Sequence, residues 1–345
     1  MAGIGYAFIS AYLKGEEAKM LSSDNLSALL KAENTQEVID SIRDTDIGSY
    51  LEGLDINTFN DVDEQLWKYF SDCLTRIVWF QNVPKASRKL LQAYTYRYDI
   101  LNIKTALQNI LSGVKTKGIP AGTVYANGSL DELVNAENLD EVISILNTAG
   151  LGEYSNALER YRLEEGFRRE VLTDTAMEDI YYKNLIGMTG RLKDGAVLSR
   201  VFQTSLDMTN LQIILRAVVN ESDSDASGQT IGGGYLLGDD FIRDMLATKL
   251  QDIPARLDYP LYRTAIEEII AGYEKDGDIS IINESIEKLK FTIIKEILSP
   301  KIMSPAVIIW YVILKEIEVR NVRLILKAVM DTIQLEEIRD YLVMA

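Results

Sequence analysis

The residues of this chain that could do chemistry are almost all carboxylates. The 345 residues include no histidine and one cysteine, Cys73. This composition excludes serine–histidine and cysteine–histidine catalysis, histidine-containing metal sites and, within one chain, thiolate zinc or iron–sulfur sites. What remains is general acid–base chemistry or the binding of a hard cation by oxygen atoms. Both need carboxylates that converge in a pocket, and the sequence shows no sign of such convergence.

Two glycine-rich segments have the glycine spacing of a phosphate-binding loop. The glycines and the residue after them are Gly113, Gly118 and Ile119 in one segment, and Gly228, Gly233 and Gly234 in the other. A phosphate-binding loop needs lysine at that last position, so neither segment is expected to hold a nucleotide. Asp223 and Asp225 could contribute oxygen ligands to a cation, but a solvated loop is the simpler interpretation. We therefore expect no catalytic residue, no metal and no cofactor.

An internal repeat of roughly a hundred residues sets the architecture in which these side chains lie. Three hexapeptides share an acidic residue followed three positions later by asparagine: Asp99–Lys104, Asp207–Gln212 and Glu318–Arg323. Their central asparagines are 108 and then 111 residues apart. Repetition at this period predicts three copies of one unit, which we divide into residues 1–105, 106–213 and 214–345.

A second repeated element indicates that the units are helical. Residues 26–39 reappear as residues 130–143, and Asn34 and Asn138 each precede a glutamate by three positions. Asparagine followed three residues later by glutamate is typical of a helix start. Apolar residues recur at spacings of three and four after each repeated asparagine, and the chain has only six prolines. The predicted fold class is all-α, with short helices over 26–31 and 130–135.

The balance of charge limits the partners that the chain can bind. The formal net charge is −16, which disfavours nucleic acid and an anionic lipid face as primary partners, although a local basic patch can still exist. The longest uncharged apolar run, Ala306 to Leu314, is shorter than the roughly 20 residues of a membrane span, so we predict that it is a buried helix segment. With no signal-like leader in view, we expect a cytoplasmic protein without a direct small-molecule substrate.

The repeated motif supplies the candidate binding residues. They are Asn102, Lys104, Asn210, Arg216, Asn321 and Arg323. As binding groups they would line a surface that meets a protein partner. As structural groups, the asparagines would be buried amides that fix the register of packed helices, which is the more conservative interpretation. The neighbouring charges predict local ion pairs, such as Asp99 with Lys104 and Asp207 with Arg216.

These motifs resemble a known family. The repeated Asp-x-x-Asn helices, the stretch from Glu318 to Leu326, the closing Leu335-Glu-Glu-Ile-Arg339 and the opening Tyr6-Ala-Phe-Ile-Ser-Ala-Tyr-Leu13 are similar to the C subunits of archaeal and bacterial V/A-type ATPases. The eukaryotic counterpart is the d subunit of the V-ATPase. The resemblance covers essentially the whole chain, although Gln212 replaces the basic residue that follows the asparagine in the other two copies.

The resemblance implies a fold and a role. It implies three similar helical domains about a pseudo-threefold axis that form a funnel. It further implies a non-catalytic central-stalk subunit that joins the central rotor shaft subunits to the membrane rotor ring of proteolipid subunits. Such a protein lies peripherally on the cytoplasmic face of the membrane and supports ATP-linked transport of protons or sodium ions. The transported ion and the direction of ATP turnover are not encoded in this chain.

Two other interpretations stay open at this point. A helical repeat scaffold could bind an unidentified protein partner, but a period near 105 residues is long for a linear solenoid. An enzyme that uses only carboxylates would need acidic residues gathered in a cleft.

Overall fold

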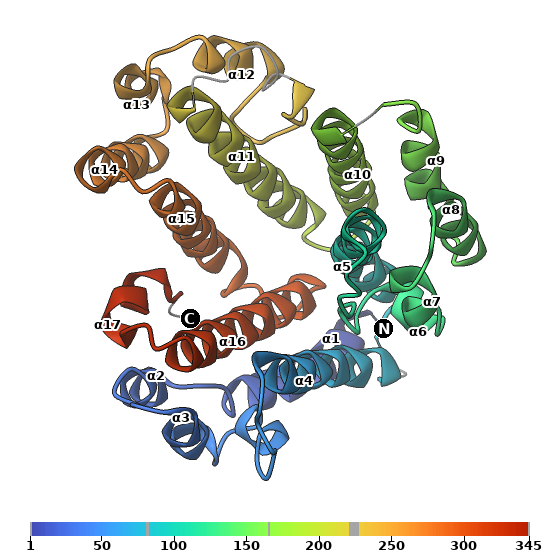
Figure 1. Ribbon diagram of the computed structural model, residues 1–345, viewed down its shortest axis with the longest axis vertical. Coiled ribbons are helices and arrows are strands. Elements are labelled where there is room, and N and C mark those ends of the chain that lie inside the picture. Colours follow the sequence, from blue (N-terminus) through green and yellow to red (C-terminus); the bar gives the residue numbers. More distant parts are fainter. Residues whose placement is uncertain (1, 81–82, 165, 221–227, 344–345) are drawn as a thin grey trace. The chain divides into compact units, whose positions relative to one another are not determined.

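The computed structural model describes residues 2–80, 83–164, 166–220 and 228–343, and within these ranges all regular secondary structure is helical (Figure 1). The predicted all-α class is therefore confirmed. Asp223 and Asp225 lie outside the described residues.

The helices follow one another along the chain with the bounds α1 (Ala2–Glu17), α2 (Ser23–Leu29), α3 (Thr35–Ile42), η1 (Gly48–Tyr50), α4 (Phe59–Trp79), α5 (Lys85–Ser112), α6 (Thr123–Ala126), α7 (Leu130–Val134), α8 (Leu139–Thr148), α9 (Gly152–Arg160), α10 (Gly166–Thr189), α11 (Gly195–Val219), α12 (Asp239–Leu246), η3 (Leu250–Asp252), α13 (Ile253–Arg256), α14 (Pro260–Asp276), α15 (Ser280–Leu298), α16 (Ala306–Met330), α17 (Leu335–Ile338) and η4 (Arg339–Tyr341).

The chain forms two compact units. Unit 1 contains residues 1–92, 119–121 and 298–345, and unit 2 contains residues 93–118 and 122–297. One boundary falls inside the long helix α5. The division into three consecutive domains, and the funnel that they would form, remain predictions.

Unit 1 is built around α16. Helices α1, α3, α4 and α17 pack against it, and the apolar run predicted to be buried, residues 306–314, lies wholly in its core. In the part of the chain that the structure describes, no helix is both long and apolar enough to cross a bilayer. The apolar side chains of α16 are therefore buried against the neighbouring helices.

Unit 2 contains one pair of packed long helices and a separate hydrophobic cluster. Helices α10 and α11 pack together, and α9 covers α10. A hydrophobic cluster joins apolar residues of α11, α12, α14 and α15, among them Leu215, Met245 and Ile266. The three repeated asparagine motifs lie on the long helices α5, α11 and α16.

The helix starts follow the caps read from the sequence. Asn34 Oδ1 accepts a hydrogen bond from the Glu37 N–H at 3.0 Å, and Asn138 Oδ1 accepts one from the Glu141 N–H at 3.0 Å. The short helices predicted before these caps are also present, as α2 and α7. A side chain at the N-cap satisfies one of the N–H groups that have no partner within the helix, so these residues define where α3 and α8 begin.

Candidate functional site

A buried asparagine lies in each of the three long helices α5, α11 and α16. Asn102, Asn210 and Asn321 are at most 3 % exposed. The Asn210 Nδ2 donates to the Ile231 carbonyl at 2.8 Å, and the Asn210 Oδ1 accepts from the Ile231 N–H at 2.9 Å. Asn321 makes the same two hydrogen bonds with Val343, at 2.7 and 3.2 Å. One side-chain amide therefore satisfies both backbone groups of a residue in the segment after the helix.

In the first copy the chain passes closely against Asn102. A Cβ added at Gly118 would lie 3.1 Å from the Asn102 Oδ1 and 2.5 Å from the Leu130 side chain. Gly118 is the second glycine of the apparent phosphate-loop spacing, and this close approach accounts for it without a phosphate. Further along α5, the Asn109 Nδ2 donates to the Thr116 carbonyl at 2.9 Å and its Oδ1 accepts from the Thr116 N–H at 2.9 Å.

The acidic residue three positions before each asparagine also binds backbone. The Asp99 Oδ2 accepts from the Thr123 N–H at 2.8 Å, and its Oδ1 accepts from the Val124 N–H at 2.9 Å. These two residues begin α6, so a buried carboxylate receives the first N–H groups of a helix. Gly122 precedes them with φ +94°, and a Cβ there would lie 2.6 Å from the Asp99 carboxylate. Only glycine fits that backbone position.

Asp207 holds the equivalent segment of the second copy. Its Oδ2 accepts from the Leu236 N–H at 2.8 Å, and its Oδ1 accepts from the Leu237 N–H at 3.2 Å. A Cβ added at Gly234 would overlap the Asp207 Oδ1, so the glycine-rich stretch before α12 also permits close contact. An acidic residue and an asparagine one helical turn apart thus form a clamp, which we call the acid–asparagine clamp.

Burial makes these clamps sensitive to pH. Desolvation raises the pKa of Asp99 and of Asp207 from 3.8 to about 6, and the backbone N–H donors oppose that rise only in part. A folded-state pKa above the unfolded value means that the folded chain holds the proton more tightly. The stability contributed by each protonated carboxyl is full below about pH 4 and is lost as the pH rises through about 6.

We therefore expect the free energy of unfolding to fall between pH 4 and 7 by up to about 3 kcal/mol for each clamp. Carboxyl carbon titration by NMR measures the two pKa values directly. The stability difference between the wild type and Asp207→Asn, which removes one titration, isolates one clamp. Asp131→Asn, at an exposed position on α7, is the matched control. Titration of both carboxyls below pH 4 would contradict the expectation.

The third copy is completed by the other end of the chain. The Glu318 Oε1 accepts from the Leu21 N–H at 2.9 Å, and Leu21 lies just before α2. The Glu318 Oε2 accepts from the Tyr69 hydroxyl at 2.7 Å and from the Lys315 Nζ at 3.0 Å. In the third copy the asparagine therefore holds a residue that follows its own helix, Val343, whereas the acidic residue holds backbone just before α2. The part of the repeat that the acidic residue holds is thus permuted to the other end of unit 1.

The residue two positions after each asparagine bridges the clamp helix to a second long helix. The pairs are Lys104 Nζ with Asp174 Oδ2 at 3.0 Å (α5 to α10), Gln212 Nε2 with Asn283 Oδ1 at 2.7 Å (α11 to α15), and Arg323 Nε with Asp63 Oδ1 (α16 to α4). The partner residues Asp63, Asp174 and Asn283 are themselves 111 and 109 residues apart in the sequence. The middle copy has therefore replaced both charges of an ion pair by amides, which retains the bridge as a neutral hydrogen bond.

This exchange predicts a measurable coupling. Gln212→Lys and Asn283→Asp are each expected to lower the free energy of unfolding slightly, whereas the double variant recreates the ion pair of the other copies. Because such pairs are partly exposed, the coupling free energy is expected to be about 0.5–1 kcal/mol. A double-mutant cycle by chemical denaturation measures it, and strictly additive effects would contradict the proposed equivalence.

The sequence patterns missed these partners. The predicted pairing of Asp99 with Lys104 is wrong, because Asp99 accepts from backbone N–H groups and Lys104 pairs with Asp174. Asp207 likewise binds backbone, while Arg216 lies exposed in the last turn of α11. The available signal was the spacing of three between acid and asparagine, which places both on one helix face.

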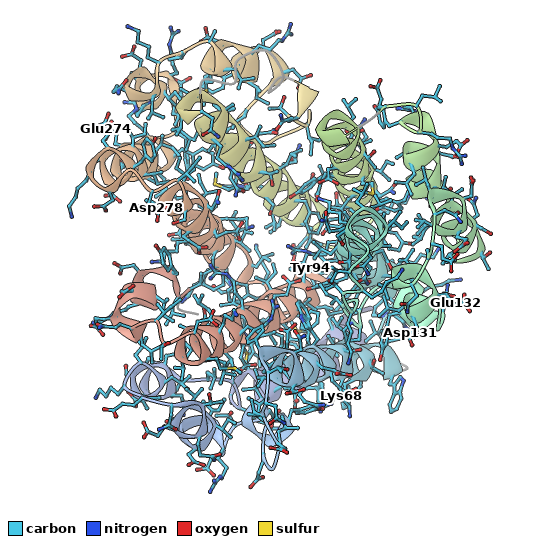
Figure 2. The ribbon with its side chains drawn as sticks, viewed as in Figure 1. Lys68, Tyr94, Asp131, Glu132, Glu274 and Asp278 are labelled. Atoms are coloured by element: carbon cyan, nitrogen blue, oxygen red, sulfur yellow. The ribbon has the colours of Figure 1, made fainter. Side chains whose placement is uncertain are left out.

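The exposed carboxylates are spread over separate elements. Figure 2 shows Asp131 and Glu132 on α7, Glu274 on α14 and Asp278 beside the start of α15. The Asp278 carboxylate accepts from the Ser280 N–H and hydroxyl, at 2.8 and 2.6 Å, and these bonds lower its pKa. Over the ranges that the structure describes, no group of three acidic or cysteine side chains is placed to hold a metal ion. Asp278 acts as a helix cap.

The fold and its clamps define an all-helical repeat protein in which the repeated polar residues hold the chain to itself. The family model described as the ATP synthase (C/AC39) subunit matches residues 9–341. The chain belongs to this family.

Curated relatives extend over the same length. The C subunit of the A-type ATP synthase of Methanocaldococcus jannaschii is 25 % identical over 98 % of this chain and 86 % of the relative. The proteins of the same name from Pyrococcus horikoshii and Thermococcus kodakarensis are 23 % and 24 % identical, each over 97 % of this chain and over 89 % and 90 % of the relative. The family resemblance inferred from the motifs is thereby confirmed.

Proposed function

We propose that this chain is a non-catalytic central-stalk subunit of a rotary V/A-type ATPase or ATP synthase, and that it couples the central rotor shaft to the membrane rotor ring. The observation that carries the proposal is the family match over residues 9–341, with the C subunits of A-type ATP synthases aligned over 97–98 % of the chain. In this role the chain supports ATP-linked transport of protons or sodium ions without binding a nucleotide itself.

The acid–asparagine clamps support the mechanical part of this proposal. Each clamp ties a long helix to another chain segment through buried hydrogen bonds, and the bridging pairs tie the same helix to a second long helix. Buried polar groups with all partners satisfied resist displacement, because any shift leaves unpaired groups in a low-dielectric interior. A protein held in this way transmits torque instead of yielding to it.

Charge supports the choice of partners. A chain of net charge −16 attracts basic surfaces, and contacts that persist through a rotation must be broad. We propose that acidic faces of the chain meet basic residues of the shaft or of the ring, and that the chain lies peripherally on the cytoplasmic face as part of the complex. Association should then weaken as the ionic strength rises, and complexes undiminished at high salt would remove the electrostatic part.

The test is capture by the two partners. Purified chain is mixed with detergent-solubilised rotor ring, with isolated shaft, and with both. Simultaneous capture at one chain per ring is the expected result. Stable binding to neither partner would overturn the coupling role and leave a helical scaffold for another protein.

The six motif residues differ in how well they can serve as contacts. Asn102, Asn210 and Asn321 are buried and are used within the fold, which favours their structural interpretation. Arg216 is the exposed member of the set, so we propose it as the first contact position to test. At this position we propose that the basic side chain pairs with an acidic group of the shaft or ring, within a contact whose partner surface is otherwise basic. Arg216→Glu is then expected to weaken shaft or ring capture at unchanged thermal stability, with Arg243→Glu, exposed on α12, as the charge-matched control.

A further inference from the structure

Four helices of unit 1 bring one end together. Asp63 of α4 pairs with Arg323 of α16, and Tyr69 of α4 donates to Glu318 of α16. The later residue of α4 therefore pairs with the earlier residue of α16, so the two helices are antiparallel (Figure 1). The last turn of α4 consequently lies at the same end of unit 1 as the loop that precedes α16.

The beginnings of α1 and α5 lie at this same end. The Phe8 ring on α1 is 5.7 Å from the Phe80 ring, directly after α4. The Tyr6 hydroxyl is 2.8 Å from the Ser87 hydroxyl in the first turn of α5. Four chain segments thus converge on one end of unit 1.

Large apolar side chains are exposed at this end. Trp79, the last residue of α4, is 77 % exposed, and Phe8 is 56 % exposed. Val78, Ile302 and Met303 are exposed as well. We call these five residues, together with the exposed Lys85 and Lys89 at the start of α5, the tip surface. Several large apolar side chains exposed at one end of a unit are a candidate interaction site.

The charge of this end is opposite to that of the whole chain. Residues 1–15, 73–92 and 298–315 contain no aspartate or glutamate, although the chain has 52 acidic residues and a net charge of −16. The same three segments contain lysines and arginines, including Lys85, Lys89 and Lys301. The tip surface therefore combines apolar side chains with positive charge.

We propose that the tip surface binds the headgroup layer of an anionic lipid membrane. Tryptophan and phenylalanine favour the interface between headgroups and hydrocarbon, and lysines beside them are attracted by anionic lipids. The net charge of the chain argued against binding to an anionic lipid face. However, the repulsion between the acidic residues and the lipid is spread over the molecule and is screened beyond about 10 Å. The tip lysines lie at the contact itself, so their attraction is screened less. The inference goes beyond the coupling role, which requires contact with ring and shaft proteins alone.

An acidic protein surface would also complement the lysines. The lipid is favoured because the most exposed aromatic residue of the tip surface is a tryptophan at a helix end, where the indole can enter the headgroup layer without a preformed pocket. The experiment separates these two occupants.

Flotation of the full chain with phosphatidylcholine vesicles, with and without phosphatidylserine, tests the proposal. The chain should float with the anionic vesicles and lose that binding at high salt. Bromine-labelled lipids should quench a component of tryptophan fluorescence that is absent from Trp79→Phe. Equal binding to neutral and anionic vesicles, or no quenching of Trp79, would overturn the proposal.

Variants supply the controls. Lys85→Glu with Lys89→Glu should weaken vesicle binding about tenfold or more, and Trp79→Ser should weaken it about tenfold. Lys249→Glu with Lys275→Glu makes the same change of charge at exposed positions of unit 2 and should leave binding unchanged. Circular dichroism confirms that each variant is folded.

Failure of vesicle binding can be distinguished from failure of the proposed coupling role. Capture of ring and shaft by a chain that ignores vesicles would retain the proposed function and overturn the lipid inference. If the tip variants then lose ring capture, the tip surface is a protein interface instead.

Discussion

Replacing Lys315 by methionine is expected to lower the free energy of unfolding by about 3–5 kcal/mol. The side chains of Lys315 and Glu318 are both 1 % exposed, and their charged atoms are 3.0 Å apart. Methionine keeps most of the packing volume but removes the positive charge. The variant therefore leaves the Glu318 carboxylate buried without its counter-charge, and removing one partner of a buried ion pair is strongly destabilising.

Chemical denaturation measures this loss, and two further variants identify its cause. Lys315→Met combined with Glu318→Gln should recover part of the stability, because the glutamine has no charge to leave unpaired and its carbonyl can still accept a hydrogen bond. Lys327→Met removes an exposed pairing with Asp331 and should change the stability by less than about 1 kcal/mol. A Lys315→Met variant as stable as Lys327→Met would contradict the assignment.

The sequence predicted the repeat and the elements that carry it, because both are local patterns. Apolar spacing and the Asn34 and Asn138 caps determine helix type and helix starts within a few residues of chain. The burial of the apolar run at 306–314 followed in the same way from its length and its lack of charge.

The partners of the repeated polar residues could not be predicted from such patterns. Glu318 meets Leu21 across 297 positions of sequence, and Gln212 meets Asn283 across 71. Distances of that size depend on how helices pack, which no local spacing encodes. The replacement of an ion pair by two amides can be recognised only when the structure shows that Asn283 is the partner of Gln212.

The circular permutation also explains why the repeat is easier to detect than to divide into consecutive units along the chain. In the first two copies the clamp helix precedes both of the segments that it holds. In the third copy α16 precedes the segment held by Asn321, but Glu318 holds a segment that begins near residue 21. A division by position along the chain therefore separates residues that are bonded to each other.

Asn210→Leu is expected to lower the free energy of unfolding by about 2–5 kcal/mol, and more than Asn321→Leu does. Leucine keeps the branched heavy-atom skeleton of asparagine but leaves one buried N–H and one buried C=O without a partner, each at about 1–3 kcal/mol. For Asn210 these groups belong to Ile231, which is 3 % exposed and lies between α11 and α12. Asp207 holds Leu236 and Leu237 a few residues further on, so the unpaired groups of Ile231 cannot easily reach water.

Val343 is equally buried, but the residues between α16 and Val343 form only the short elements α17 and η4, so this segment can open locally. Asn321→Leu should therefore release the segment after α17 to water and lose less global stability. Hydrogen exchange distinguishes the two responses, because Asn321→Leu should raise exchange mainly over residues 335–343, whereas Asn210→Leu should raise it across the α11–α12 region. Equal global losses with no local exchange around Val343 would show that the last segment is held by contacts other than the Asn321 amide.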